Sequence, residues 1–153
     1  MKAKTIALTI SLVFVSVAMG FQTDAQIGTW KLNEAKSKFE GKARNHTVVY
    51  EAAGDQTKVT VEGVDETGNA VRNEWTGKFD GKDYPVTGDA NSDARSYKII
   101  DKNTLAITGK KGGKTTLTGR IVVSSDGKTR TVTTTATDAQ GKKVTNVAVY
   151  DKQ

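Results

Sequence analysis

Few side chains in this sequence suit catalysis or metal binding. There is one histidine, His46, and no cysteine, which excludes thiol nucleophiles and histidine-rich metal sites. His46 alternates with Val48 and Tyr50 on one face of a predicted strand, a position more typical of a sheet rim than of a general base. We therefore predict no catalytic residue, no metal ligand and no cofactor, and an enzymatic function is the least favoured of three hypotheses.

Two loops resemble known ligand loops only in part. Residues 109–115 (GKKGGKT) match the end of a phosphate-binding loop, but Thr108 replaces its first glycine and no helix is predicted to follow. Residues 89–93 (DANSD) have the opening spacing of a calcium loop, but Ala94 and Ile100 stand where that loop needs a glycine and a glutamate. We interpret the two segments as a hairpin turn and a polar loop.

Aromatic residues and two arginines offer a different chemistry, the binding of a small molecule. A buried arginine needs a partner, and the carboxylate of a ligand would supply one. In the alternative, Arg130 packs on Trp30 and Arg95 pairs with an acid of the protein, which leaves a filled core. The sequence leaves both alternatives open. The candidate ligand-binding residues, all expected on inward faces, are Tyr50, Trp75, Arg95, Tyr97 and Tyr150.

These residues must be positioned by strands. Short segments rich in Val, Ile, Thr and Tyr alternate polar and apolar residues, and turns containing Gly, Asp or Asn separate them. Most turns have hairpin length, so consecutive strands are expected to pair antiparallel. We expect strands at 27–32, 45–52, 57–63, 70–79, 82–86, 94–100, 103–109, 115–124, 128–136 and 143–151.

Two local features refine this pattern. Pro85 cannot donate to a strand ladder, so the segment 82–86 is expected to be short or to lie at an edge. A single helical turn is expected within 33–40, with Asn33 as its N-cap. Because every strand has one apolar face, an open meander would leave two exposed edges, and closure removes them. The predicted fold is all-β, a single antiparallel up-and-down meander of about eight to ten strands closed into a barrel.

Residues 1–25 are expected to lie outside this fold. A basic start is followed by an uncharged run over residues 5–19, which is shorter than the roughly 20 residues needed to cross a bilayer. This order is typical of a secretory signal peptide. Cleavage is expected after Ala25, or alternatively after Gly20, and leaves a barrel domain at 26–153. We expect an exported, periplasmic or extracellular protein with no membrane span after cleavage.

The charge pattern argues against a polyanionic partner. The chain has 23 Lys and Arg residues against 17 Asp and Glu residues, a formal net charge of +6, but the two signs are interspersed as on a solvated surface. We therefore expect no nucleic-acid partner, and a monomer. Since the chain lacks cysteine, its core must hold the fold without disulfides.

The first predicted strand carries a recognisable motif. Gly28-Thr29-Trp30 resembles the Gly-x-Trp of the calycins, the superfamily of lipocalins and fatty-acid-binding proteins, and the chain is similar to small secreted bacterial proteins with an N-terminal Gly-x-Trp. The resemblance implies a calycin-like barrel in which Gly28 and Trp30 close one end and a late-strand arginine packs over the tryptophan. Arg130 matches that arginine best, and Arg120 is second.

The sequence differs from fatty-acid-binding proteins at positions that form their ligand site, so that site cannot be assigned to this chain from the resemblance. Fatty-acid-binding proteins hold a carboxylate with an Arg two residues before the C-terminal Tyr, and Ala148 stands there in this chain. The link 33–44 is also too short for their helix pair. The favoured function is an exported barrel that binds a small apolar or amphipathic molecule, with an anionic group among the options. The alternative is a non-enzymatic interaction module of the cell envelope that uses its Thr- and Lys-rich outer face.

The signal peptide yields a direct prediction. The mature N-terminus should lie between Phe21 and Gln26, because cleavage follows the small residues after the apolar run. N-terminal sequencing of exported protein measures this. Exported material that begins at Met1 would contradict it.

Overall fold

The computed structural model describes residues 24–138 and 140–153. The expected signal peptide lies outside the described residues except for its last two positions. Of these two, Ala25 packs against the core. Within the described residues, no helix is long and apolar enough to cross a membrane.

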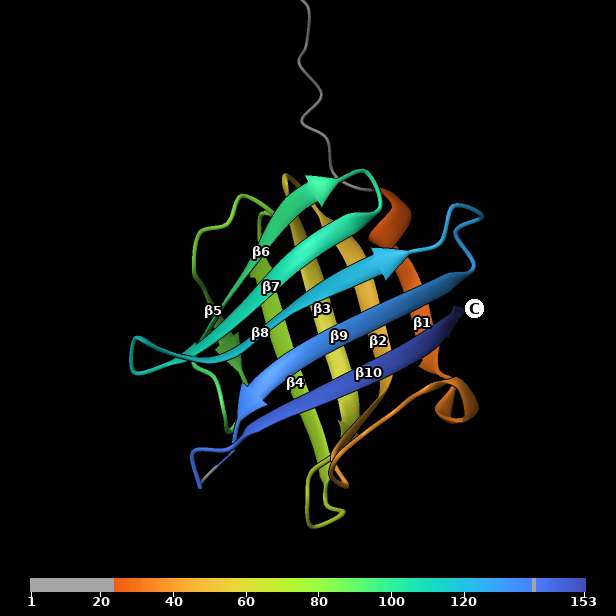
Figure 1. The fold of residues 1–153 in the computed structure, drawn as a ribbon. Coiled ribbons are helices and arrows are strands. Elements are labelled where there is room, and N and C mark those ends of the chain that lie inside the picture. Colours follow the sequence, from red (N-terminus) through yellow and green to blue (C-terminus); the bar gives the residue numbers. More distant parts are fainter. Residues whose placement is uncertain (1–23, 139) are drawn as a thin grey trace, which may run out of the picture.

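Ten strands form one closed antiparallel barrel (Figure 1). Each strand pairs with its neighbours in sequence, and the first pairs with the last, which confirms the predicted closed meander. The strand positions agree with the sequence pattern to within one or two residues. The strands are β1 (Gly28–Leu32), β2 (Arg44–Ala53), β3 (Gln56–Val64), β4 (Ala70–Gly77), β5 (Tyr84–Thr87), β6 (Ala94–Asp101), β7 (Thr104–Lys111), β8 (Lys114–Val123), β9 (Thr129–Thr137) and β10 (Lys143–Lys152).

The short non-strand elements also follow local sequence. A 3₁₀ turn, η2 (Glu34–Lys36), follows β1, and the Asn33 side chain accepts a hydrogen bond from the Lys36 amide at 3.2 Å. This confirms the expected cap, since a side-chain oxygen satisfies an otherwise free amide. A second 3₁₀ turn, η1 (Asp24–Gln26), precedes β1. Pro85 lies in β5, which is only four residues long, as the missing amide donor requires.

The register divides the barrel interior into two halves. Directly paired residues point to the same side of a sheet, so rows of inward residues can be followed from strand to strand. One row joins Tyr50, Val59 and Trp75 across β2, β3 and β4, and these three residues are at most 1% exposed. We call the part of the interior around Trp30 and this row the closed half. The core of buried hydrophobic residues lies mainly there: Trp30, Val48, Tyr50, Val59, Val61, Trp75, Val86, Tyr97, Leu105, Ile121, Val123, Ala148 and Tyr150.

The opposite half of the barrel has smaller and more polar inward residues. Tyr97 is paired in register through Ile107 and Gly119 to Thr134 and Asn146, so this row crosses from β6 to β10. After Tyr97, every member of the row is partly exposed. The next row toward the end of the barrel is also paired in register, and we call the part of the interior lined by both rows the open half. That second row is Arg95, Gly109, Leu117, Ala136 and Val144.

Trp30 seals the closed half together with η1. Its indole is fully buried, and its Nε1 donates to the Gln26 carbonyl at 2.9 Å. Gly28 adopts a φ of 131°, and a Cβ at this position would come within 2.7 Å of the Lys152 side chain. A side chain at Gly28 would therefore be strained by its backbone conformation, and the flexible end of Lys152 would have to move aside. The Gly-x-Trp motif thus places the indole of Trp30 inside the barrel, while the backbone of β1 runs next to β10.

The packing of Trp30 gives a stability prediction. Trp30→Ala should lower the free energy of unfolding by about 3–5 kcal/mol, because a large buried ring is lost and a cavity is left. Val122→Ala, at a strand position that is 42% exposed, is the matched control and should cost less than about 0.5 kcal/mol. Denaturant melts followed by circular dichroism measure both changes. Coincident melts of wild type and Trp30→Ala would mean that the indole does not seal the barrel.

Candidate functional site

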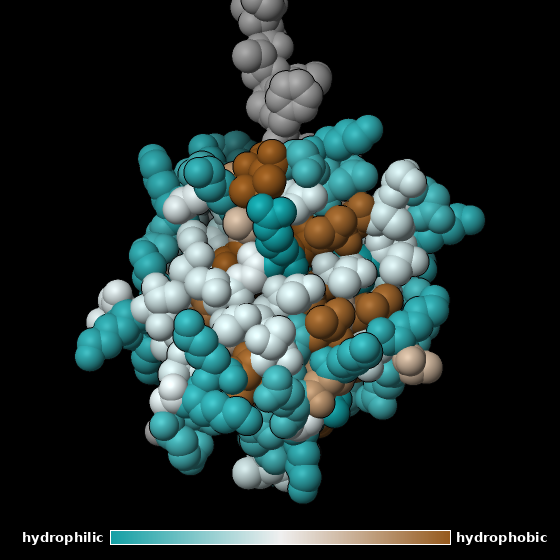
Figure 2. Space-filling model, in the orientation of Figure 1, coloured by the Kyte–Doolittle hydropathy of each residue, from teal (hydrophilic) through white to brown (hydrophobic). Residues whose placement is uncertain are grey.

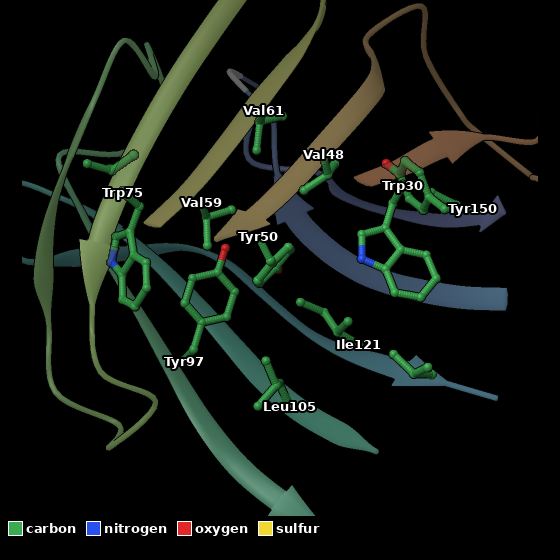
Figure 3. Close-up of a cluster of buried hydrophobic side chains, with 13 residues drawn as sticks. Trp30, Val48, Tyr50, Val59, Val61, Trp75, Tyr97, Leu105, Ile121 and Tyr150 are labelled. Carbon is green, nitrogen blue, oxygen red and sulfur yellow. The ribbon is translucent and has the colours of Figure 1, made fainter. Parts of the chain in front are cut away.

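The aromatic candidates lie together in the barrel interior. Figure 3 shows Tyr50 between Trp30 and Tyr150 on one side and Trp75 and Tyr97 on the other. The Tyr97 ring meets the Trp75 ring edge-on at 4.7 Å between centroids and the Tyr50 ring at 6.3 Å. The Trp75 Nε1 donates to the Arg95 carbonyl at 2.9 Å. The five candidate ligand-binding residues thus belong to one connected interior, with Arg95 at its edge toward the open half.

Arg130 is a buried cation without a complete set of partners. It is 3% exposed, and its Nη2 donates to the Tyr50 hydroxyl at 2.7 Å. Its guanidinium carbon lies 4.6 Å from the Tyr50 ring centroid, 5.5 Å from that of Tyr150 and 5.9 Å from that of Trp30. Its Nε and Nη1 have no hydrogen-bond partner in the described part of the chain. Ring faces attract a cation, but they leave these two donors unsatisfied.

Arg95 differs because the protein supplies its counter-ion. Its Nη2 donates to Asp89 Oδ2 at 2.9 Å and its Nη1 donates to Asn73 Oδ1 at 3.2 Å. The Arg95 side chain is 10% exposed and that of Asp89 is 18% exposed. Burial lowers the pKa of the Arg95 guanidinium, but the neighbouring Tyr97 and Asp89 raise it by more, so the net shift is upward. Arg95 is therefore a charged, paired group at the wall of the open half.

The contacts that the filled-core alternative requires are both present. Arg130 packs over the indole of Trp30, and Arg95 pairs with Asp89. The two arginines are nevertheless unequal, since only Arg130 keeps free buried donors. The interior therefore holds a cationic hydrogen-bond donor, Arg130, that is surrounded by aromatic rings and could bind an anion.

The tyrosine hydroxyls next to Arg130 stay protonated. Burial raises the pKa of Tyr50 far above its ordinary value, and the charges of Arg130 and Arg95 offset only part of that shift. Burial likewise raises the pKa of Tyr150, against a smaller lowering by Arg130. Both residues are therefore neutral phenols over the physiological range and act as hydrogen-bonding groups.

Several residues of the interior could not be identified from the sequence alone. Phe79 is an exception, because it shares the face of Trp75 in the alternating pattern of residues 70–79; it follows β4, and its ring stacks on Trp75 at 6.2 Å between centroids, tilted by 12°. Gln26 is fully buried next to Trp30, and its Oε1 has no partner among the described residues. Asp89 comes from the β5–β6 loop, where no periodicity indicates an inward side chain. For Asn73 the sequence did indicate an inward side chain, because Asn73 shares the face of Trp75 in the alternating pattern of β4.

Among the described residues, Ile100 and Val122 are the large hydrophobic side chains exposed on the outer surface. A shallow hollow over β2, β3 and β4 is lined by the outward residues Thr47, Val49, Glu51, Thr60, Glu62 and Arg72. There Arg72 pairs with two exposed glutamates, Glu62 and Glu74. Figure 2 shows the outer face of the strands in front, where hydrophilic side chains surround residues of intermediate hydropathy and a few apolar ones. Within the described residues, no three His, Asp or Glu side chains are grouped to hold a metal ion.

The buried tyrosines predict a stability loss at high pH. Above about pH 10 the unfolded chain releases its tyrosine protons, whereas the raised pKa values of Tyr50 and Tyr150 keep them bound in the folded state. The unfolding free energy should then fall by up to about 1.4 kcal/mol per pH unit for each such tyrosine. Tyr50→Phe and Tyr150→Phe should each reduce the slope. Denaturant melts from pH 8 to 11 measure it, and slopes equal to wild type would contradict the assignment.

Comparisons with known proteins concern the barrel fold. No protein-family model and no curated protein matches the sequence. Among solved structures, a redesigned β-barrel bound to DFHBI shares 13% identity at a TM-score of 0.49, over 85% of this chain and 97% of its own. Zebrafish ileal bile acid-binding protein in complex with cholic acid shares 16% identity at a TM-score of 0.46, over 84% of this chain and 99% of its own. A further redesigned β-barrel shares 12% identity at a TM-score of 0.47, over 86% of this chain and 94% of its own.

Proposed function

We propose that this protein is an exported barrel that binds a small amphipathic molecule in its interior, with the anionic group of that molecule at Arg130. The observation that carries the proposal is the buried guanidinium of Arg130, whose Nε and Nη1 have no partner among residues 24–138 and 140–153. An unpaired buried charge is costly, and a carboxylate accepts two parallel hydrogen bonds from a guanidinium. Nε and Nη1 lie on opposite edges of the guanidinium, so a bound carboxylate would accept from one of them together with the remaining hydrogen of Nη2.

The open half supports the second part of this proposal, an apolar ligand body. Eight strands give a barrel just wide enough for side chains to fill, and the diameter grows with strand number. This barrel has ten strands, so larger side chains than in an eight-stranded barrel would be needed to fill it. Its open half is instead lined in part by small residues such as Gly119 and Ala136. These inward positions stay partly exposed, which is expected where solvent, or a ligand in its place, reaches the interior.

Export belongs to the proposal as well. It is motivated by the basic, apolar and small-residue order of residues 1–25, which is typical of a signal peptide. In this setting the barrel would carry or hold a poorly soluble molecule outside the cytoplasm.

A series of matched ligands tests the anionic preference. Long-chain carboxylates should bind better than the corresponding alcohols or methyl esters, because only the acid compensates the charge of Arg130. Each buried methylene should add about 0.8 kcal/mol until the interior is full. Arg130→Met should abolish the preference for acids. Because this change removes an unpaired charge, its unfolding free energy without ligand should stay within about 1 kcal/mol of wild type.

Arg95→Met is the matched control, since it removes an inward arginine that already has an acid partner. It should keep an acid-over-alcohol preference but lose stability, because Asp89 is left without its counter-ion. Titration calorimetry on delipidated, folded protein measures all variants, and native mass spectrometry of untreated protein detects a co-purified molecule. An absence of heat and of any chain-length trend would instead favour the outer face as the functional surface.

A further inference from the structure

Gln26 is a polar residue at a position where the fold makes little use of its side chain. The residue is fully buried, yet its Oε1 has no hydrogen-bond partner among residues 24–138 and 140–153. Its Nε2 lies 3.5 Å from the Asn103 carbonyl, beyond the usual range of an N–H···O hydrogen bond. Burying an amide without good partners costs free energy that an apolar side chain of similar size would not cost. Folding alone therefore does not explain a glutamine here.

Gln26 is also the residue that the expected signal-peptide cleavage turns into a new N-terminus. Thr23 and Ala25 are the small residues before the cleavage point, and cleavage after Ala25 makes Gln26 the first residue. The Gln26 carbonyl accepts from the Trp30 indole at 2.9 Å, and cleavage does not remove either of these groups. The new α-amino group is therefore placed at the end of the barrel that Trp30 seals, and not on a free tail.

The surroundings of this amino group are unfavourable for a positive charge. Lys152 Nζ lies 5.2 Å from the centroid of the Trp30 ring, and the Arg130 guanidinium carbon lies 5.9 Å from it. Cleavage after Ala25 also removes Asp24, the acidic residue nearest to the new terminus in sequence. Burial and neighbouring cations both favour the neutral amine over the ammonium ion. The neutral amine has the lone pair that a nucleophile needs.

We propose that Gln26 is a modification site, which after export and cleavage cyclises to pyroglutamate and places a neutral lactam next to Trp30. This inference rests on the proposed export. The α-nitrogen attacks Cδ of its own side chain, so that an N–Cδ bond forms while the Cδ–Nε2 bond breaks. One hydrogen of the amine moves to Nε2, which leaves as ammonia. The reaction consumes no oxidant, reductant or co-reactant.

Cyclisation removes both of the groups that this site cannot satisfy. The ammonium ion and the primary amide bring several N–H donors into the interior, whereas the lactam keeps one N–H and retains the former Oε1 as its carbonyl oxygen. The positive charge disappears as well. The backbone carbonyl of Gln26, which accepts from Trp30, is not altered. The cyclised N-terminus should therefore stabilise this end of the barrel relative to the free amine.

Mass spectrometry of exported wild-type protein tests the modification and needs no variant. The N-terminal peptide should begin at Gln26 and should be lighter than its free-amine form by the mass of one ammonia. A free amine at Gln26, or a chain that begins at Phe21, would overturn the inference while export stands. Protein that is not exported would refute export and the inference together. The ligand titrations decide the anionic site independently of all these outcomes.

A stability comparison tests the physical reason for the modification. Protein released from a fusion partner immediately before Gln26 has a free amine, and its cyclised product differs from it only at this residue. The equilibrium constant for unfolding should be about tenfold smaller for the cyclised form. Gln26→Met, released in the same way, is the matched control, because it keeps the amine and a side chain of similar length but has no amide; its mass and stability should not change on incubation. Equal unfolding constants for the two Gln26 forms would overturn the inference.

Discussion

The pairing of β1 with β10 is the interaction on which the rest of the molecule depends. Three registered residue pairs join these strands, beginning at Trp30 and Lys152, and they convert an open meander into a barrel with no free edge. Closure also gives the apolar strand faces a common interior, which an open sheet of the same sequence would lack. The Gly-x-Trp motif serves this pairing directly, because Gly28 lets the chain pass close to Lys152 and Trp30 fills the end of the barrel.

Once the barrel is closed, the distribution of side-chain volume decides what its interior can do. Large rings fill the closed half, where Trp30, Tyr50 and Trp75 are at most 1% exposed. The rows on the other side carry glycine, alanine and threonine, and solvent reaches part of them. Close-packed interiors do not tolerate voids without cost, and the small inward residues Gly109, Gly119 and Ala136 on three neighbouring strands supply less side-chain volume here than the rings supply in the closed half.

The sequence predicted the strands well because each has a period of two and ends at a turn with its own residue signal. Pro85 predicted a short β5 and Asn33 predicted the cap of η2 for equally local reasons. The inward direction of the aromatic candidates followed from the same period. What it could not predict was the pairing of side chains across loops. Asp89 reaches Arg95 from a loop without periodicity, and the partners of Arg130 depend on three-dimensional proximity.

The contrast between the two inward arginines is the strongest argument about function. Folding alone explains Arg95, since its charge is neutralised by Asp89 and its second nitrogen is bonded to Asn73. It explains Arg130 only in part: the side chain packs over Trp30, Tyr50 and Tyr150, but a methionine of similar length could fill the same site without a desolvation cost. The contacts with three rings and the hydrogen bond to the Tyr50 hydroxyl recover part of that cost, but in the described part of the chain two donors stay unsatisfied. The proposed anionic ligand would supply an acceptor for one of these two donors.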